Sequence, residues 1–240
     1  MKAFCKGILA AAVGLLWCGI AVGQAAADHP DFSGFWELRY DSFNVPRAQL
    51  TPQAASADMA KQEENDRLAI RWCDQLGTPA LMAERQPLDI RQSPKEVAIV
   101  AHPNSSVRYI YTDGRKHPDK DDYDPTTNGH SVGQWQGDTL VVDTIYFNDR
   151  GVTRLPGGGI RTPDSHLTEN YKLLNNGQNL LVIFTWEDPK VFAKPHTYAY
   201  MYYKVAEPGM PRIYTCTSGD KTRANFLMTD PKPGTGWPVN

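Results

Sequence analysis

A two-residue turn between two runs of strand-forming residues constrains the fold of this chain more than any other feature. Gly137-Asp138 separates SVGQWQ (131–136) from TLVVDTIYF (139–147). A two-residue loop led by glycine favours a type II′ turn, whose twist matches that of a hairpin. Pairing of Gln136 with Thr139 then sets the register of every later pair. The segment NGHSVGQWQGDTLVVDT (128–144) is therefore predicted to form an antiparallel hairpin.

This register places a polar pair on one face of the hairpin. Side chains alternate along a strand and directly opposed residues share a face, so His130 and Asp143 are diagonal neighbours, roughly 7 Å apart at the backbone. We expect both to point into a cavity, with Trp135 and Leu140 pointing away from it. The carboxylate would then orient the imidazole as an acid/base pair. The alternative is a structural hydrogen bond at the end of the hairpin.

A second hairpin is predicted around Asn176-Gly177, the dipeptide most typical of a type I′ turn. Pairing Asn175 with Gln178 places Glu169 in an otherwise apolar row. The row contains Leu167, Tyr171, Leu173, Leu180, Val182, Phe184 and Trp186. Burial disfavours a charged carboxylate, so Glu169 is a candidate acid/base catalyst. The alternative is a carboxylate satisfied by an arginine or by backbone donors.

Short strands separated by turn signals account for most of the remaining chain. The strand candidates are 87–92, 96–102, 107–113, 131–136, 139–147, 165–174, 179–187, 196–205 and 212–217. One helix is predicted within 50–73, with Thr51 as N-cap and Pro52 at the first helical position. This pattern predicts an all-β barrel or sandwich with one N-terminal helix. The long polar segments 113–129 and 148–164 are typical of loops at a binding site.

The N-terminus has the pattern of a secretory signal peptide. Lys2 and Lys6 precede an apolar stretch over 7–22, and small residues follow up to Ala27. We therefore expect cleavage of residues 1–27 and a periplasmic or secreted protein without a stable membrane anchor. Residues 28–240 then form a single domain, at a length usual for all-β folds. A retained membrane anchor is the alternative.

Removal of this leader leaves two cysteines, Cys73 and Cys216. Two thiols in an exported chain predict one disulfide, worth about 4 kcal/mol in the chain-entropy model. The alternative is a pair of buried free thiols. The net charge of −2, without a basic stripe, gives no reason to expect nucleic acid as a partner.

The sequence contains no spacing typical of a metal or cofactor site. His117, His130 and His166 could meet as a three-histidine metal site, but the chain has no H-x-H or H-E-x-x-H motif. The run Gly157-Gly158-Gly159 lacks the lysine and the strand-to-helix context of a phosphate loop. We therefore expect neither a metal nor a cofactor.

Tyrosines and arginines supply candidate groups for a ligand pocket. Tyr198, Tyr200 and Tyr202 alternate along one predicted strand and could line it with flat apolar walls. A tyrosine ladder in the core or on the exterior is the alternative. Arg108 and Arg115 could bind a carboxylate or enolate oxygen, or pair with the acidic loop.

Several motifs, in this order, resemble an exported bacterial family that is largely uncharacterised. They are YTDGRKHP, NGHSVGQWQGDTLVVDT, FND, EDPKVFAKP and a late cysteine, around a G-H-S-x-G-x-W-x-G-D-T-L-V-V core, and they extend over roughly residues 31–217. The opening DFSGFWEL is similar to the G-x-W start of lipocalin-like barrels, in which Trp36 would close the barrel floor. The chain departs from the family pattern at DSHLTEN, where S-x-x-L-H is expected, so no role is carried over to His166.

The resemblance implies a single exported, lipocalin-like antiparallel β-barrel. It marks as motif positions Arg115, His117, Asn128, His130, Asp143 and Asn148. We expect a barrel that binds a small apolar or aromatic molecule and performs cofactor-free proton transfer, as an isomerase, lyase or hydratase. The catalytic candidates are His130, Asp143 and Glu169. The ligand-binding candidates are Arg115, His117, Asn128, Asn148, Tyr198 and Tyr200.

Two other functions fit the same sequence. A non-catalytic periplasmic carrier would use the same pocket and the same side chains for affinity alone. An envelope or interaction protein would have a solid core without a pocket.

Overall fold

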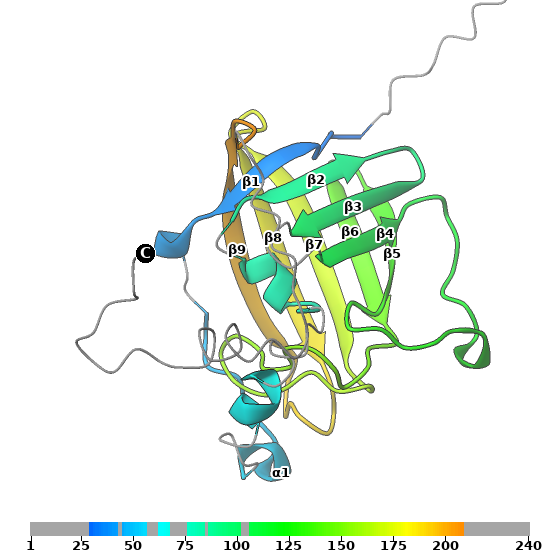
Figure 1. The fold of residues 1–240 in the computed structure, drawn as a ribbon, viewed down its shortest axis with the longest axis vertical. Coiled ribbons are helices and arrows are strands. Elements are labelled where there is room, and N and C mark those ends of the chain that lie inside the picture. The colour runs from blue at the N-terminus through cyan, green and yellow to red at the C-terminus, as the bar shows by residue number, and fades with distance from the viewer. Residues whose placement is uncertain are drawn as a thin grey trace, which may run out of the picture.

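The computed structural model describes residues 29–42, 45–56, 62–67, 76–84, 86–101 and 106–208. Within these residues nine strands form one closed barrel (Figure 1), which confirms the predicted all-β, lipocalin-like architecture. The strands are β1 (Gly34–Leu38), β2 (Leu88–Gln92), β3 (Glu96–Ala101), β4 (Ser106–Tyr111), β5 (His130–Gln136), β6 (Thr139–Ile145), β7 (His166–Leu174), β8 (Asn179–Glu187) and β9 (His196–Val205). The expected signal peptide, Cys73, Cys216 and the expected strand 212–217 lie outside the described residues.

Each strand pairs with the next one along the chain, and β9 pairs with β1 to close the barrel. All of these pairs are antiparallel except β4 with β5, which is parallel and contains only Ile110 with Ser131 and Tyr111 with Val132. The antiparallel prediction was wrong for this pair. A parallel pair needs a crossover connection of a dozen or more residues, and the polar segment 112–129 supplies it.

The helical segments are short and lie before β2 or within loops. Helix α1 (Pro52–Ala55) begins as predicted, because the Thr51 side chain accepts a hydrogen bond from the backbone N–H of Ala54 at 3.2 Å. Residues 62–67 are also helical. The 3₁₀ turns are η1 (Tyr40–Ser42), η2 (Ala80–Ala83) and η4 (Lys120–Asp122). No helix in the described ranges is both long enough and apolar enough to cross a membrane.

Both predicted hairpins have the predicted register. His130 lies opposite Ile145 in the first hairpin, and Glu169 lies opposite Phe184 in the second. The row that contains Glu169 faces the barrel interior, as expected, and the Glu169 side chain is fully buried. The turn residue Asn176 has the positive φ of 52° that a type I′ turn requires.

The interior face of the first hairpin is the opposite of the predicted one. Leu140 and Val142 have no exposed surface, and Trp135 packs against the core through Phe32. The row of His130 and Asp143 therefore lies on the outside of the barrel. Apolar residues occur on both faces of this hairpin, and the loop over 112–129 covers the outer one, so alternation alone did not identify the interior.

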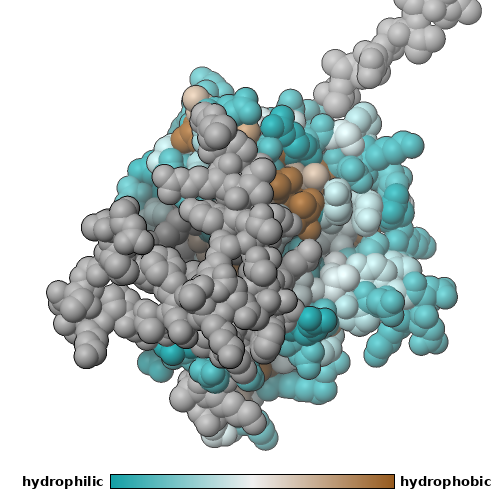
Figure 2. All heavy atoms as spheres, viewed as in Figure 1, coloured by the Kyte–Doolittle hydropathy of each residue, from teal (hydrophilic) through white to brown (hydrophobic). Residues whose placement is uncertain are grey.

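The barrel interior is lined mainly by large apolar and aromatic side chains. Trp36 is fully buried, and its Nε1 donates to the carbonyl oxygen of Phe32 at 2.8 Å. Burial of each large apolar side chain contributes about 1.5–3 kcal/mol to folding. On the outside, hydrophilic side chains cover most of the described surface on the face drawn in Figure 2.

Candidate functional site

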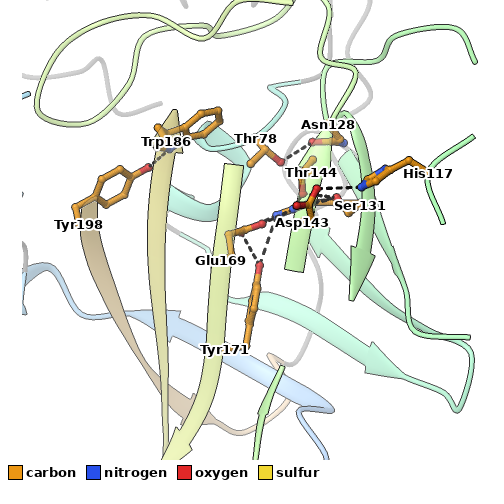
Figure 3. A network of polar contacts seen from close by, with 11 residues as sticks. Thr78, His117, Asn128, Ser131, Asp143, Thr144, Glu169, Tyr171, Trp186 and Tyr198 are labelled. Carbon is orange, nitrogen blue, oxygen red and sulfur yellow. Dashed lines mark hydrogen bonds and ion pairs between the residues drawn. The ribbon is translucent and has the colours of Figure 1, made fainter. Parts of the chain in front are cut away.

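A row of hydrogen-bonded polar side chains lies on the outer face of β5, β6 and β7. Nδ1 of His117, from the crossover loop, lies 2.8 Å from Nδ1 of His130, and its Nε2 lies 3.0 Å from Oδ1 of Asp143. Nε2 of His166, at the start of β7, lies 2.8 Å from Oδ2 of Asp143. We call these four residues the histidine row. His130 and Asp143 thus interact through His117 rather than directly, as the dashed contact between His117 and Asp143 in Figure 3 illustrates.

Two unusual backbone conformations hold the row in place. Gly129 has a φ of +68°, and a Cβ at this position would lie 2.6 Å from the carbonyl oxygen of Ile145, so only glycine fits before His130. Tyr146 has a φ of 63°, which is an outlier for a bulky residue. This conformation directs the Tyr146 hydroxyl to the carbonyl oxygen of Pro118, to which it donates at 3.0 Å. Strained residues of this kind cluster at functional sites.

The environment separates the pKa values along the row. Burial lowers the pKa of His130 from 6.5 to about 4, with smaller contributions from the neighbouring His117 and Arg115. The hydrogen bond from His166 holds the pKa of Asp143 below its usual value despite partial burial. The hydrogen bond to Asp143 outweighs burial and raises the pKa of His166. At neutral pH, His130 is therefore neutral and Asp143 is ionised.

These protonation states determine the tautomers of the two coupled imidazoles. An ionised Asp143 only accepts hydrogen bonds, so Nε2 of His117 carries the proton that it donates. With His117 in its neutral form, its Nδ1 is an acceptor, and Nδ1 of His130 donates to it. The basic nitrogen of His130 is therefore Nε2, which makes no hydrogen bond within the described part of the chain.

A pocket of about 190 Å³ lies in the barrel wall beside His130. It forms because β4 and β5 separate before Ile110, where their short parallel pairing begins. At this point the Asn128 side chain donates to the carbonyl oxygen of Val107 at 3.2 Å and accepts from the Thr78 hydroxyl at 3.2 Å. We call this the wall pocket. Its lining includes Arg108, Tyr109, Tyr111, Tyr123, Asn128 and His130.

Behind the wall pocket, the barrel interior contains a buried ion pair. Both carboxylate oxygens of Glu169 accept from the guanidinium of Arg108, one of them at 2.9 Å, and Tyr171 donates to the same carboxylate at 2.9 Å (Figure 3). Ser131 and Thr144 each accept from Arg108 at 3.0 Å.

This ion pair answers the question that the sequence left open about Glu169. Burial by itself would lower the pKa of Arg108, but the carboxylate of Glu169 outweighs it and raises that pKa above its ordinary value. Glu169 is thus a carboxylate satisfied by an arginine, which was the alternative to its role as a catalyst. Its oxygens are occupied, and it has no exposed surface.

Arg115 and Asn148, two of the predicted ligand-binding residues, differ in how close they lie to the wall pocket. Arg115 is ion-paired to Asp113 at 2.6 Å, and its guanidinium lies 3.9 Å above the ring of Tyr111, which lines the wall pocket. Asn148 instead braces the loop, because its side chain donates to the carbonyl oxygen of Pro125 at 3.2 Å.

The tyrosine row of β9 belongs to the barrel core rather than to the wall pocket. Tyr198 and Tyr200 are 3% and 1% exposed. They form a tyrosine ladder in the core, which was the alternative to their role as pocket walls. The ring of Tyr198 stacks on Phe184 at 5.0 Å, and its hydroxyl accepts from Nε1 of Trp186 at 3.2 Å (Figure 3). The hydroxyl of Tyr202 donates to the carbonyl oxygen of Met82 at 2.6 Å.

Sequence reasoning gave His166 no role beyond a possible metal site and missed two other residues of this region. His166 is a diagonal neighbour of Asp143, because Thr168 lies opposite Asp143 in the β6–β7 pair. The register of β6 with β7 would have found it, but a long loop separates those strands. Tyr111 and Tyr123 gave no signal, since the parallel pairing of β4 with β5 brings Tyr111 to His130 and the path of the crossover loop brings Tyr123 there.

No protein-family model matches the chain, and no curated protein matches it. The family resemblance drawn from the sequence therefore stays a prediction. His117, His130 and His166 do share one site, yet across the described ranges no group of histidine, cysteine, aspartate or glutamate side chains has the arrangement of a metal site. Functional reasoning rests on the geometry of the histidine row and the wall pocket.

Proposed function

We propose that this protein binds a small aromatic molecule in the wall pocket and that His130 removes a proton from it. The reaction belongs to the cofactor-free isomerase, lyase or hydratase classes. One observation carries this proposal: Nε2 of a neutral His130 is left without a hydrogen-bond partner beside a pocket with aromatic walls. A general base needs this combination of a basic lone pair and access to the substrate.

The histidine row provides a path for the proton that His130 takes up. When Nε2 of His130 accepts a proton, its Nδ1 proton can pass across 2.8 Å to Nδ1 of His117. The positive charge then resides on His117, which already donates to the ionised Asp143 at 3.0 Å. The carboxylate stabilises the imidazolium there, as in other histidine–carboxylate pairs. This relay compensates for the low pKa of His130 itself.

The walls of the pocket favour a flat, largely apolar ligand. The ring of Tyr111 lies 5.4 Å from that of His130, and the ring of Tyr123 meets His130 edge-on at 5.1 Å. Aromatic side chains pack best against other rings in offset or edge-to-face contact.

Proton removal can be tested with nitrobenzisoxazole, an aromatic probe with an acidic ring C–H. Loss of that proton breaks the N–O bond and releases a coloured cyanophenolate, so the rate can be followed by absorbance. We expect catalysis above the buffer rate, with loss of most of the rate in His130→Gln. His29→Gln is the matched control, since His29 stacks on Trp135 away from the pocket. Equal rates in wild type and His130→Gln would refute the role of His130 as the base.

The low pKa of His130 favours a second candidate, a carrier that binds the same aromatic ligand without chemistry. A base with a pKa of about 4 takes up few protons at neutral pH unless the relay assists it. In a carrier, His130→Gln changes the dissociation constant, whereas in an enzyme it lowers turnover and leaves binding largely intact.

Export is the other part of the proposal, and its support is the leader-like pattern of residues 1–27. N-terminal sequencing of the protein isolated from its native host should begin at Asp28. A mature protein that retains Met1 would refute export by this route.

A further inference from the structure

We infer that the wall pocket is specific for a neutral, single-ring phenol whose hydroxyl donates a hydrogen bond to Nε2 of His130. This inference rests on the proposed function, because it names the class of ligand for the same pocket. Three independent features of the pocket carry it: its hydrogen-bonding groups, its charge and its size.

The hydrogen bonds of Asn128, Tyr123, Thr126 and His130 favour a ligand with a donor. The Asn128 amide is engaged at both ends, by Val107 and Thr78. The hydroxyls of Tyr123 and Thr126 both donate to the carbonyl oxygen of Gly129, at 3.3 and 3.1 Å. Nε2 of His130 is the strong acceptor that lacks a donor, because its tautomer is set by His117 through Nδ1. A ligand that supplies an O–H to this atom completes the hydrogen bonding of the pocket.

The charges around the pocket favour a neutral ligand over a carboxylate. Arg108 is neutralised by Glu169 in the interior, and Arg115 is neutralised by Asp113 on the surface. His130 is uncharged at neutral pH because its pKa is low. The lining residues that the structure describes therefore offer no uncompensated positive charge. An anion that entered would lose hydration without gaining a counter-charge, which is costly.

The volume of the pocket fits one aromatic ring. Cavities of about 150 Å³ bind benzene, and the wall pocket has about 190 Å³. The additional space accommodates a hydroxyl and a small substituent. Tyr111 and Tyr123 both contact the ring of His130 and provide the ring contacts. A phenol held in this way presents its acidic proton to the base that the proposed function requires.

The test is a binding series of three ligands of similar size, phenol, anisole and benzoate, titrated into the full protein at pH 7 and followed by NMR. Anisole has the ring and the oxygen but no donor, and benzoate has a negative charge. We expect phenol to bind about tenfold more tightly than anisole, the effect of one hydrogen bond to a buried acceptor. Benzoate should bind more weakly than phenol.

Two variants locate the preference within the pocket. His130→Phe removes the acceptor and should abolish the preference of phenol over anisole. Tyr123→Phe retains the ring and leaves His130 intact, so it should keep that preference, and His29→Gln, at a residue that stacks on Trp135, serves as the folded comparison. Loss of the phenol preference in Tyr123→Phe would place the hydrogen bond on the tyrosine and overturn the inference.

The outcomes separate this inference from the proposed function. Equal affinities of phenol and anisole would overturn the hydrogen bond to His130 but leave an aromatic pocket. Tightest binding of benzoate would overturn the neutral ligand and indicate an anion site. Failure of all three ligands to perturb the resonances of Tyr111, Tyr123 and His130 would overturn the proposed function as well.

Discussion

Removal of one partner of the buried ion pair should destabilise the barrel far more than removal of both. Arg108 and Glu169 are 1% and 0% exposed, so Glu169→Leu leaves a guanidinium charge in the core without its counter-charge. Two unit charges about 4 Å apart attract by about 4 kcal/mol at an effective dielectric constant of about 20. Single removal of a buried partner typically costs about 3–5 kcal/mol, which agrees with this value.

The double variant, Arg108→Met with Glu169→Leu, should recover most of this loss, because apolar replacements of a buried pair are often close to neutral. The assay is urea unfolding at pH 7 of both single variants, the double variant and the wild type, analysed as a double-mutant cycle. The exposed pair of Lys172 and Asp138, 3.1 Å apart, is the matched control. Asp138→Asn should cost far less than Glu169→Leu, because solvent screens this pair.

Two results would contradict this reasoning. If Glu169→Leu cost no more than Asp138→Asn, the carboxylate would not be compensating a buried charge. If the two single losses simply added in the double variant, Arg108 and Glu169 would not be coupled, and the guanidinium would depend on Ser131 and Thr144 instead.

Three further predictions concern stability and covalent structure. The folded-state pKa of His130, about 4, lies below the ordinary 6.5. The contribution of neutral His130 to the free energy of unfolding is therefore complete above pH 6.5 and is lost as the pH falls towards 4. This loss of stability is at most about 3 kcal/mol and is reduced by the solvent that reaches the pocket. Urea unfolding at a series of pH values should show the loss in the wild type and not in His130→Gln. Gly129→Ala should cost more than about 2 kcal/mol in thermal unfolding, because backbone strain and a clash with a carbonyl oxygen add. Gly137→Ala, which has open space around it, should cost about 1 kcal/mol. Equal losses in the two variants would contradict the clash at Gly129. Mass spectrometry after alkylation without reductant should find Cys73 and Cys216 protected as a disulfide, and two labelled thiols would disprove it.

Local turn chemistry was sufficient to predict the two hairpins. Gly137-Asp138 and Asn176-Gly177 each determine a register, and every pair in β5–β6 and β7–β8 follows from it. The placement of Glu169 in an apolar interior row came from the same step. These contacts join residues close in sequence, so a single sequence contains the information that specifies them.

The orientation of the first hairpin depends on contacts that are distant in sequence. The β6–β7 pair places Val142 opposite Glu169, on the row already expected to be interior, but the loop over 148–164 hides that register from the sequence. Ser131 and Thr144 lie on the interior face together with Leu140 and Val142. Ser131 and Thr144 are buried because Arg108 needs their hydroxyls.

The pairing of β4 with β5 is short, so part of β4 keeps an unpaired edge although the barrel is closed. Before Ile110, no β5 residue pairs with β4 within the described ranges. Unpaired strand edges invite the addition of a strand from another molecule, and proteins block them by covering or occupying their polar groups. Asn128 does this with its side chain, which takes the carbonyl oxygen of Val107 that an incoming strand would use. The same amide that shapes the wall pocket therefore also protects the barrel against edge-to-edge aggregation.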